Sequence, residues 1–316
     1  MRVILVGHGY FGSLYRQRIQ DNTNYKLVGV CDPDYNRLTT LTGTTVAEKY
    51  DALADNVEHD AVIVCTPPHL HADVSIEALM RKKNVLCMKP GVMSEKDLTM
   101  INALAHKDNL VFLIDYTMMW AQENAYLDRQ FYWIGRPEKI SSNRLVVGAP
   151  KPEGPVWDLL PHDVATYHTH CLAPHGIDMI TSVSCNSDGI SATARLISDE
   201  KDVAYFIASY NATSPMKTTR FDVYPDKQVV TNPRFMITWD QNKRSIMTES
   251  QGGTLGVYFS GHPDPITLAL NKFIREVGDV EWYAPSYIER QDWVTRILTA
   301  FHHSSEHDGA IVRISK

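Results

Sequence analysis

Three polar residues, far apart in the chain, have the chemistry needed to move a proton and to stabilise a developing charge. Lys89 ends an apolar strand-like run, where an ammonium is costly unless the chain leads it to a cleft or an anion. Asp158 and His162 have the i, i+4 spacing that puts two side chains on one side of a helix, and Asp158 precedes Pro161 as a helix cap would. An imidazole titrates near neutral pH and a carboxylate can orient it, so the pair suits proton transfer from an alcohol. Taken alone, the three residues could equally be a surface lysine, a carboxylate that caps a helix and a surface histidine, with no role in catalysis.

A glycine-rich segment near the N-terminus has the pattern that binds the diphosphate of a dinucleotide. Gly7, Gly9 and Gly12 form G-x-G-x-x-G between a strand-like run and a helical pattern. Asp32 lies 20 positions past Gly12, at the end of the second strand-like run, where a carboxylate binds ribose hydroxyls and repels a 2′-phosphate. The pattern predicts NAD, but Arg37 could partner a phosphate, so NADP is not excluded. Two alternatives stay open for this segment. The glycines could form an ordinary tight turn that binds no ligand, or they could bind another nucleotide such as S-adenosylmethionine.

The elements that position these residues alternate in type over the first third of the chain. Short apolar runs separated by helical patterns predict a parallel sheet with crossover helices. The runs are Val3 to Val6, Leu27 to Cys31, Thr45 to Ala47, Ala61 to Cys65, Val85 to Met88 and Val111 to Asp115. We therefore predict a doubly wound α/β domain over residues 1–118, with the polar residues at the carboxyl ends of its strands.

Beyond residue 119 the pattern changes to strand-like runs without helices between them, which predicts a second, α+β domain over residues 119–316 with an antiparallel sheet. The runs are Ile140 to Val147, Ser191 to Ile197, Val203 to Tyr210 and Lys217 to Tyr224. Helical patterns follow at Pro265 to Val277 and Tyr287 to His303, and a closing strand at Ala310 to Ile314. We expect the final helix and strand to pack back near the first domain.

Composition excludes several classes of protein. The chain has 316 residues and 31 Lys and Arg against 37 Asp and Glu, a net charge of -6, which argues against a nucleic-acid or anionic membrane surface as partner. No apolar run approaches the roughly 18 residues of a bilayer span. The first strand-like run follows Met1 directly and leaves no room for a secretory signal, so we expect a cytoplasmic protein.

The five cysteines are scattered and are expected to be buried free thiols.

Four motifs in this order resemble the Gfo/Idh/MocA oxidoreductases, named for glucose-fructose oxidoreductase and inositol dehydrogenase. They are the glycine motif from Gly7, C-T-P-P from Cys65, the strand-end Lys89-Pro90, and D-x-x-x-H-D from Asp158. The resemblance covers essentially the whole chain. It implies a Rossmann domain followed by a domain with an open antiparallel sheet, through which such proteins commonly form dimers or tetramers.

The resemblance also implies a chemistry. The chain would be an NAD(P)-dependent dehydrogenase that transfers hydride to or from a secondary alcohol of a sugar, cyclitol or nucleotide sugar. Lys89 would hydrogen-bond the reacting hydroxyl, His162 would be the general base or acid, and Asp158 would hold the substrate or the histidine. These three residues would converge beside the nicotinamide. The expected cofactor contacts are Gly7, Gly9, Tyr10, Phe11, Gly12, Asp32, Thr66, Pro67, Pro68, His71, Lys89 and Pro90. Candidates to bind a small polar substrate are Tyr116, Trp120, Arg144, Trp157 and Tyr167.

The sequence departs from the family pattern beside Lys89. Position 88 is usually Glu and is Met88 in this chain, which removes a charge that could pair with the lysine. The segment 115–120 lacks the Asn and Arg often seen in sugar-oxidising members. Two alternatives stay open: an imine or enone reductase of the same family, and a dinucleotide-binding sensor without turnover.

A metal-dependent hydrolase is a further alternative. Its potential ligands lie within fourteen residues and are His162, His168, His170, Cys171 and His175. Along a helix, His168 and His170 would point to different sides, and Pro174 ends the helix before His175. We therefore predict that no metal is bound.

Overall fold

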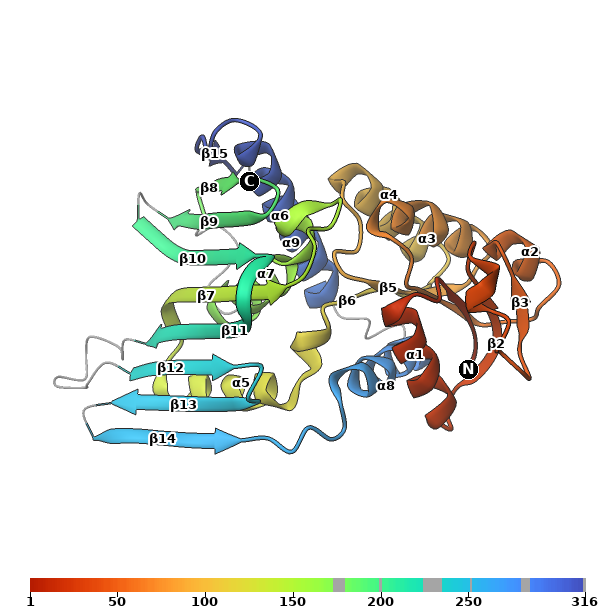
Figure 1. Cartoon of the computed structure of the whole chain (residues 1–316), viewed down its shortest axis with the longest axis horizontal. Coiled ribbons are helices and arrows are strands. Elements are labelled where there is room, and N and C mark those ends of the chain that lie inside the picture. Colours follow the sequence, from red (N-terminus) through yellow and green to blue (C-terminus); the bar gives the residue numbers. More distant parts are fainter. Residues whose placement is uncertain (173–179, 199–200, 224–234, 251, 280–284, 315–316) are drawn as a thin grey trace. The chain divides into compact units, whose positions relative to one another are not determined.

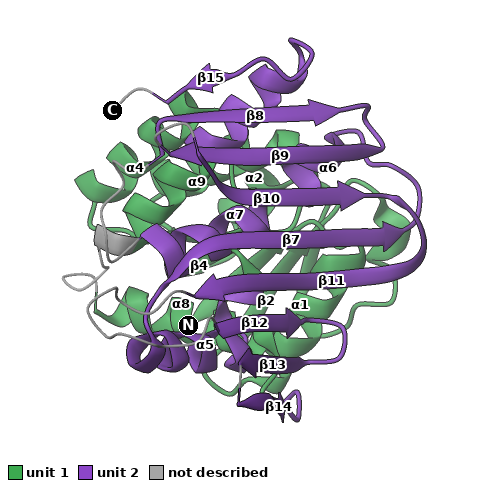
Figure 2. Cartoon of the chain, turned by 90° about the vertical axis from the view of Figure 1, so that its left-hand side faces the viewer, with its two compact units in different colours: residues 1–117, 263–295 green, residues 118–262, 296–316 purple. Residues whose placement is uncertain are grey.

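The computed structural model of the chain describes residues 1–172, 180–198, 201–223, 235–250, 252–279 and 285–314 (Figure 1). These residues form two compact units. The first contains residues 1–117 and 263–295, and the second contains residues 118–262 and 296–316 (Figure 2). The polypeptide thus contributes to each unit twice.

The first unit is built on a six-stranded sheet in the order β3-β2-β1-β4-β5-β6, with every pairing parallel. The strands are β1 (Arg2–Val6), β2 (Lys26–Cys31), β3 (Thr45–Ala47), β4 (Ala61–Val64), β5 (Asn84–Met88) and β6 (Phe112–Asp115). The central strands are apolar throughout because crossover helices bury both faces of such a sheet. The strand order reverses between β1 and β4, which creates the point where doubly wound folds bind ligands. The prediction of a Rossmann-type domain is confirmed.

Helices complete the first unit. They are α1 (Tyr10–Asp21), α2 (Tyr50–Ala54), α3 (His71–Met80), α4 (Glu95–Lys107), α8 (Pro265–Gly278) and the N-terminal part of α9 (Pro285–Ser305), with the single turns η1 (Tyr35–Arg37) and η2 (Pro68–Leu70). The late helix α8 is held by the Tyr25 hydroxyl, which donates to the carbonyl oxygen of Leu270 at 2.6 Å, and by an ion pair between Arg18 and Asp264 at 2.8 Å. The C-terminal sequence therefore supports the N-terminal sheet.

The second unit contains a nine-stranded sheet in the order β14-β13-β12-β11-β7-β10-β9-β8-β15. Its strands are β7 (Pro137–Val147), β8 (Ser182–Ser187), β9 (Ser191–Ser198), β10 (Lys201–Ser209), β11 (Asn211–Val223), β12 (Phe235–Asp240), β13 (Ser245–Ser250), β14 (Gly253–Tyr258) and β15 (Val312–Arg313). Only the β7 and β10 pairing is parallel among these described strands. The prediction of an open, mainly antiparallel sheet is confirmed, while the predicted strand end at Tyr224 lies outside the described residues.

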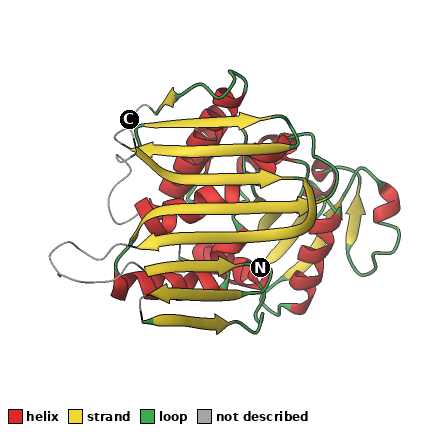
Figure 3. Cartoon of the chain, turned by 60° about the vertical axis from the view of Figure 1, so that its left-hand side comes forward, coloured by secondary structure: helices red, strands yellow, loops and turns green. Residues whose placement is uncertain are grey.

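One face of this sheet carries all the described helices of the unit (Figure 3). These are α5 (Gln122–Ile134), α6 (Gly154–Asp158), α7 (Pro161–Tyr167) and the C-terminal part of α9, followed by the single π-helical turn η4 (His168–Leu172) after α7. Along β10, Phe206 and Ala208 are buried under these helices. Tyr205 and Ile207 alternate with them and therefore point to the opposite face, where Tyr205 is exposed.

A buried ion pair ties the first turn of α7 to the middle of this sheet. The Nε and Nη2 atoms of Arg144, on β7, donate to the two carboxylate oxygens of Asp163 at 2.7 and 3.0 Å. The Ser142 hydroxyl donates to the same carboxylate at 2.7 Å, and Arg144 also donates to Gln241 at 3.2 Å. Asp163 directly follows His162, so this network fixes the backbone that carries the predicted acid or base.

The five cysteines are free thiols, as predicted: four are buried and Cys65 is half-buried. Burial raises the pKa of each of them, to about 12 for Cys31 and Cys185. Of the helices formed by the described residues, none combines the length and the apolar character that a bilayer span requires.

Arg144→Met should destabilise the protein strongly, because it leaves the Asp163 carboxylate buried without its counter-charge. We expect a loss of roughly 3–5 kcal/mol in the free energy of unfolding. The double variant Arg144→Met, Asp163→Leu should recover much of that loss, since neither charge is then buried alone. Urea titrations followed by circular dichroism measure both effects. Arg195→Met, which breaks the exposed pair with Asp202, serves as control and should cost less than about 1 kcal/mol. A double variant as unstable as the single one would contradict this account.

Candidate cofactor and catalytic site

The glycine loop between β1 and α1 is built from close backbone contacts that exclude side chains. Gly7 has φ +91°, and a Cβ atom there would lie 2.6 Å from the carbonyl carbon of Cys65. A Cβ atom on Gly12 would lie 2.1 Å from the carbonyl oxygen of Gly7, so α1 packs directly on the loop. At Gly9, in contrast, the nearest atom to an added Cβ is Nη1 of Arg37 at 3.6 Å. The fold itself thus demands two of the glycines and leaves room for a Cβ atom at the third.

The N-terminus of α1 can receive an anion. Gly9 is its N-cap and provides no side-chain oxygen to the first backbone N–H groups, and the first turn carries no acidic residue. Unpaired N–H groups and the helix dipole together favour a phosphate at such a position. Tyr10 and Phe11, in the first turn, have 76% and 45% of their surfaces exposed, so their rings border this terminus. A dinucleotide diphosphate fits the loop.

Asp32 lies beside this loop at the end of β2, and its carboxylate is buried. One oxygen accepts the backbone N–H of His8 at 2.7 Å and the other accepts that of Asp34 at 2.9 Å. Arg37 reaches the carboxylate at 3.4 Å and is half-exposed. In a dinucleotide-binding fold, a carboxylate at the position of Asp32 binds the adenosine ribose. Asp32 could therefore accept the ribose hydroxyls of NAD, and Arg37 could pair with the 2′-phosphate of NADP.

The carboxyl ends of β4 and β5 are joined by a buried histidine. The Nε2 atom of His71 lies 2.8 Å from the carbonyl oxygen of Thr66, and its Nδ1 atom lies 2.7 Å from that of Gly91. Burial lowers the pKa of His71, against the effect of the two carbonyl groups, so the ring is neutral at neutral pH and donates to one carbonyl at a time. His71 therefore holds together the two turns that contain Thr66 and Lys89.

Other predicted cofactor residues surround this edge. The Thr66 hydroxyl oxygen is buried and makes no hydrogen bond within the described part of the chain, as expected of a group reserved for a ligand. Pro67 and Pro68 start the turn η2, with Pro67 exposed. Lys89 follows β5 directly and is half-buried, and its peptide bond to Pro90 is cis.

Asp115 is a buried acid at the same edge that the sequence analysis missed as a site residue. It ends β6 and is 0% exposed, and it accepts hydrogen bonds from the hydroxyls of Tyr15 and Thr117. A signal was present in the sequence, since Asp115 ends an apolar strand-like run just as Lys89 does. Strand ends of this kind are where polar residues of parallel sheets gather.

The prediction that Asp158 caps a helix is wrong. Asp158 is the last residue of α6, and α7 begins at Pro161 with Leu160 as its N-cap, so two short helices replace the continuous one that was expected. The buried carboxylate instead accepts the hydroxyl of Tyr210 at 2.8 Å and pairs with Lys151 at 3.6 Å. Burial and the charge of Asp158 raise the pKa of Tyr210, so the tyrosine stays protonated and donates.

His162 lies in the first turn of α7 and is half-buried. The Thr166 hydroxyl donates to its carbonyl oxygen at 2.8 Å, and the neighbouring Asp163 is fixed by Arg144. Lys89 belongs to the first unit, whereas Asp158 and His162 belong to the second. Their convergence stays a prediction.

The candidate substrate residues occupy different environments. Arg144 is buried and its guanidinium is engaged by Asp163, so it supports α7 and we remove it from the candidate site. Tyr116 follows β6 with a buried hydroxyl that has no partner among the described residues, and burial raises its pKa. Trp157 and Tyr167 are buried, and Trp120, in the single turn η3 (Thr117–Trp120), is half-buried.

One residue of the metal alternative, His170, is engaged elsewhere, and another lies outside the described residues. His170 is fully buried, its Nε2 atom lies 2.7 Å from the Asn124 side-chain oxygen, and its ring contacts Phe131 and Phe221. His175 is outside the described residues. Within the described ranges, no three His, Cys, Asp or Glu side chains come together as metal ligands.

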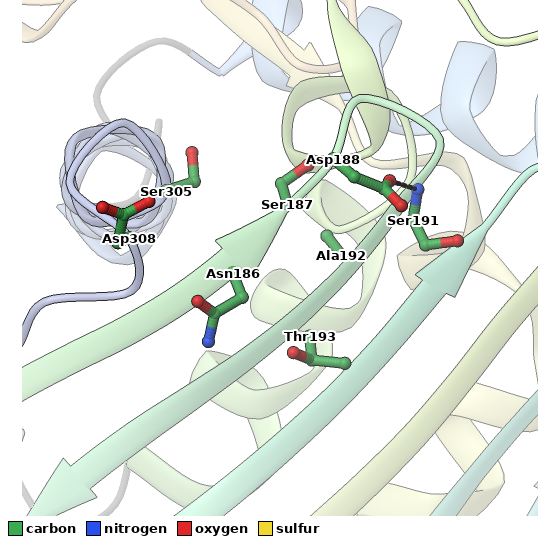
Figure 4. A pocket seen from close by; sticks show the side chains of 8 residues that line it. All are labelled: Asn186, Ser187, Asp188, Ser191, Ala192, Thr193, Ser305 and Asp308. Carbon is green, nitrogen blue, oxygen red and sulfur yellow. Dashed lines mark hydrogen bonds between the residues drawn. The ribbon is translucent and has the colours of Figure 1, made fainter.

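A shallow hollow of about 350 Å³ in the second unit contains none of the predicted residues. Figure 4 shows that its lining comes from the end of β8, the start of β9 and the turn between them, and from the end of α9 and the residues after it. The Asp188 carboxylate accepts the backbone N–H groups of Ile190 and Ser191 at 2.9 and 2.6 Å. This acid closes a turn, so the hollow is a consequence of the hairpin.

Comparison with known proteins agrees with the geometry of the first unit. Residues 1–116 match the family described as "Oxidoreductase family, NAD-binding Rossmann fold". An uncharacterized oxidoreductase of Streptococcus pneumoniae is 33% identical over 115 residues, which are 36% of this chain and 31% of that protein. The 2,7-anhydro-N-acetylneuraminate hydratase of Mediterraneibacter gnavus is 29% identical over 122 residues, again 36% of this chain and 31% of that protein. The chain thus spans about a third of the length of these relatives.

A solved structure matches the fold of the whole chain. UDP-N-acetylglucosamine 3-dehydrogenase from Acidithiobacillus ferrooxidans superimposes with a TM-score of 0.81 over 97% of this chain and 98% of its own, at 18% sequence identity. At this identity the likeness concerns the fold. The resemblance drawn from the sequence motifs is confirmed for the first unit: residues 1–116 match the Gfo/Idh/MocA oxidoreductase family in its NAD-binding Rossmann fold.

Proposed function

We propose that this chain is an NAD(P)-dependent oxidoreductase acting on a secondary alcohol, or the corresponding ketone, of a sugar, cyclitol or nucleotide sugar. The observation that carries the proposal is the glycine loop with Asp32 at the switch point of the sheet, combined with Lys89 at a neighbouring strand end. Two similar proteins support the substrate class by their names. The hydratase of Mediterraneibacter gnavus acts on a derivative of N-acetylneuraminate, and the dehydrogenase of Acidithiobacillus ferrooxidans acts on a nucleotide sugar.

In the proposed mechanism, two side chains act on the reacting hydroxyl. A bound nicotinamide supplies the chemistry of hydride acceptance and donation. His162 takes the hydroxyl proton during oxidation and returns it during reduction. Lys89 donates a hydrogen bond to the same oxygen and stabilises the negative charge that develops on it. Asp158, whose carboxylate contacts Tyr210 and Lys151, would bind a substrate hydroxyl or orient His162.

The cofactor would be held by the loop from Gly7 to Gly12, by Asp32 and by Thr66. We propose NAD as the preferred form because a 2′-phosphate beside the Asp32 carboxylate is repelled. Arg37, which already contacts Asp32, would reduce that repulsion and allow binding of NADP with lower affinity.

Gly9→Ala tests the cofactor site without disturbing the loop. The added methyl group has room in the protein, with Arg37 Nη1 at 3.6 Å, but it occupies the approach of a diphosphate to the backbone. We expect the Kd for NADH, measured by fluorescence titration, to rise about tenfold or more while the melting temperature is unchanged. Gly12→Ala is the matched comparison and should lower the melting temperature, because its Cβ meets the carbonyl oxygen of Gly7. Unchanged NADH affinity in folded Gly9→Ala would remove the proposed site.

Lys89→Met and His162→Asn test the proposed catalytic roles. Each removes a group that acts on the reacting oxygen, so kcat should fall by roughly 10²–10⁴-fold while the Kd for NADH changes little. Oxidation of a panel of sugars, cyclitols and nucleotide sugars, followed by NADH absorbance, provides the measurement. The exposed substitutions Lys96→Met and His69→Asn are controls and should retain wild-type rates. Full activity in either test variant would contradict the assignment.

A sensor that binds dinucleotide without turnover is the second candidate, and Met88 is the observation that favours it. Tight NADH binding by the wild-type chain, with no turnover on the whole panel, would support the sensor. An imine or enone reductase would instead consume NADH with an imine or enone, and its proton would come from His162 or Lys89.

We also propose that a second copy of the chain covers the helix-free face of the nine-stranded sheet. Tyr205 and Ile207 point to this face from β10, and apolar side chains on a broad sheet face favour burial. Dimers or tetramers formed in this way would match the common arrangement of the family that the sequence resembles.

Ile207→Lys should dissociate this oligomer, because a lysine at the centre of the interface would be buried without a partner. Size-exclusion chromatography with light scattering should then give the mass of a smaller species. Met100→Lys, on exposed α4, is the control and should leave the mass unchanged. A wild-type protein that is monomeric at all concentrations would refute the proposal.

A further inference from the structure

Asp115 is a buried carboxylate without a role in the mechanism proposed above. It is 0% exposed, and burial of an unprotonated acid is costly unless donors compensate it. Two donors are present: the Tyr15 hydroxyl from α1 and the Thr117 hydroxyl, which lies 3.2 Å from the same oxygen atom. Hydroxyl donors favour the ionised form of a carboxylate. The two hydroxyl donors therefore offset part of the cost of an ionised carboxylate at the carboxyl edge of this sheet.

The strand register puts this carboxylate level with Met88, the residue before Lys89. In the parallel pairing of β5 and β6, Asp115 is the direct partner of Met88, and neighbouring strands lie about 4.8 Å apart. Lys89 is the next residue, where β5 has ended and the chain turns, with the Gly91 N–H donating to the carbonyl oxygen of Met88 at 2.9 Å. The ammonium and the carboxylate thus belong to adjacent strand ends within one unit.

Three titratable groups at the ends of β4 and β5 are uncharged at neutral pH. Burial lowers the pKa of His71, and the charge of Lys89 contributes to that decrease. Burial raises the pKa values of Cys65 and Cys87, so both thiols stay protonated. On α9, the charge of Arg290 lowers the pKa of Tyr116, whereas the charge of Asp292 raises it. Asp292 also accepts a hydrogen bond from the side-chain amide of Asn102 at 2.9 Å.

We propose that Asp115 is a positioning residue for Lys89, and that its carboxylate keeps the lysine protonated and directed at the reacting oxygen. It provides from β6 the negative charge that Met88 does not provide from β5. This inference rests on the role proposed above for Lys89, but it concerns the ionisation of one side chain and can be tested without a substrate. It also means that Met88 alone is no reason to expect a chain without turnover.

Competitive labelling measures the ionisation of Lys89 directly. The full-length protein is treated with trace acetic anhydride across a range of pH, and mass spectrometry of the peptide containing Lys89 gives the midpoint of labelling. In Asp115→Asn the midpoint should move to lower pH, and labelling at a fixed neutral pH should rise about tenfold, because an adjacent opposite charge has been removed. Glu58→Gln is the matched control, since it removes an exposed charge that pairs with Arg2 away from this edge.

A rescue variant uses the strand register. Met88→Glu in the Asp115→Asn background returns a carboxylate to the same level of the sheet, and the labelling midpoint should move back toward the wild-type value. A midpoint that is unchanged in Asp115→Asn, or unchanged by adding Met88→Glu, would overturn the proposal.

A second variant covers the case in which Asp115→Asn does not fold. Met88→Glu alone should then move the midpoint to higher pH, and a midpoint equal to that of the wild type would again overturn the proposal. A wild-type chain without dehydrogenase activity would refute the proposed function while leaving these labelling results interpretable.

Discussion

The close packing of Gly12 against the Gly7 carbonyl group, which leaves no room for a Cβ atom, is the constraint on which the first unit depends. It brings α1 against the end of β1, and the backbone of Gly7 in turn packs against the β4 to α3 turn at Cys65. Three elements therefore meet mainly through main-chain atoms, at the point where the strand order reverses. The N-terminus of α1 begins at this junction, and an anion bound there would meet its first N–H groups.

The sequence was a good guide to this unit and a poorer one to the second. Parallel strands that are buried on both faces read as continuous apolar runs, and all six predicted runs correspond to strands. In the second unit, the sequence pattern does not predict β8 or β12 to β14. An antiparallel sheet with one face free of helices mixes polar and apolar residues, so these strands lack a continuous apolar run. The parallel pairing of β7 with β10 joins strands distant in the chain, and no local pattern encodes it.

Site residues were predictable where the backbone alone determines their position, and less so where side chains compete for partners. The glycines and Asp32 follow from turn geometry and strand length. Asp158 was expected to cap a helix, but the turn after α6 and the hydroxyl of Tyr210 give it another environment. Arg144 appeared suitable for a polar substrate, yet its partner Asp163 is 19 residues away and belongs to a different element. Such pairings depend on packing that a local spacing rule does not contain.

The buried thiols have a practical consequence for spectroscopy. A protonated, enclosed cysteine is a weak nucleophile, and the raised pKa values apply to all five in this chain. Maleimide dyes and nitroxide spin labels will therefore react slowly with the native cysteines and quickly with a new one placed on the surface. Pairs of introduced cysteines, one in each unit, can carry such labels for distance measurements by fluorescence energy transfer or pulsed electron resonance without prior removal of the natural ones.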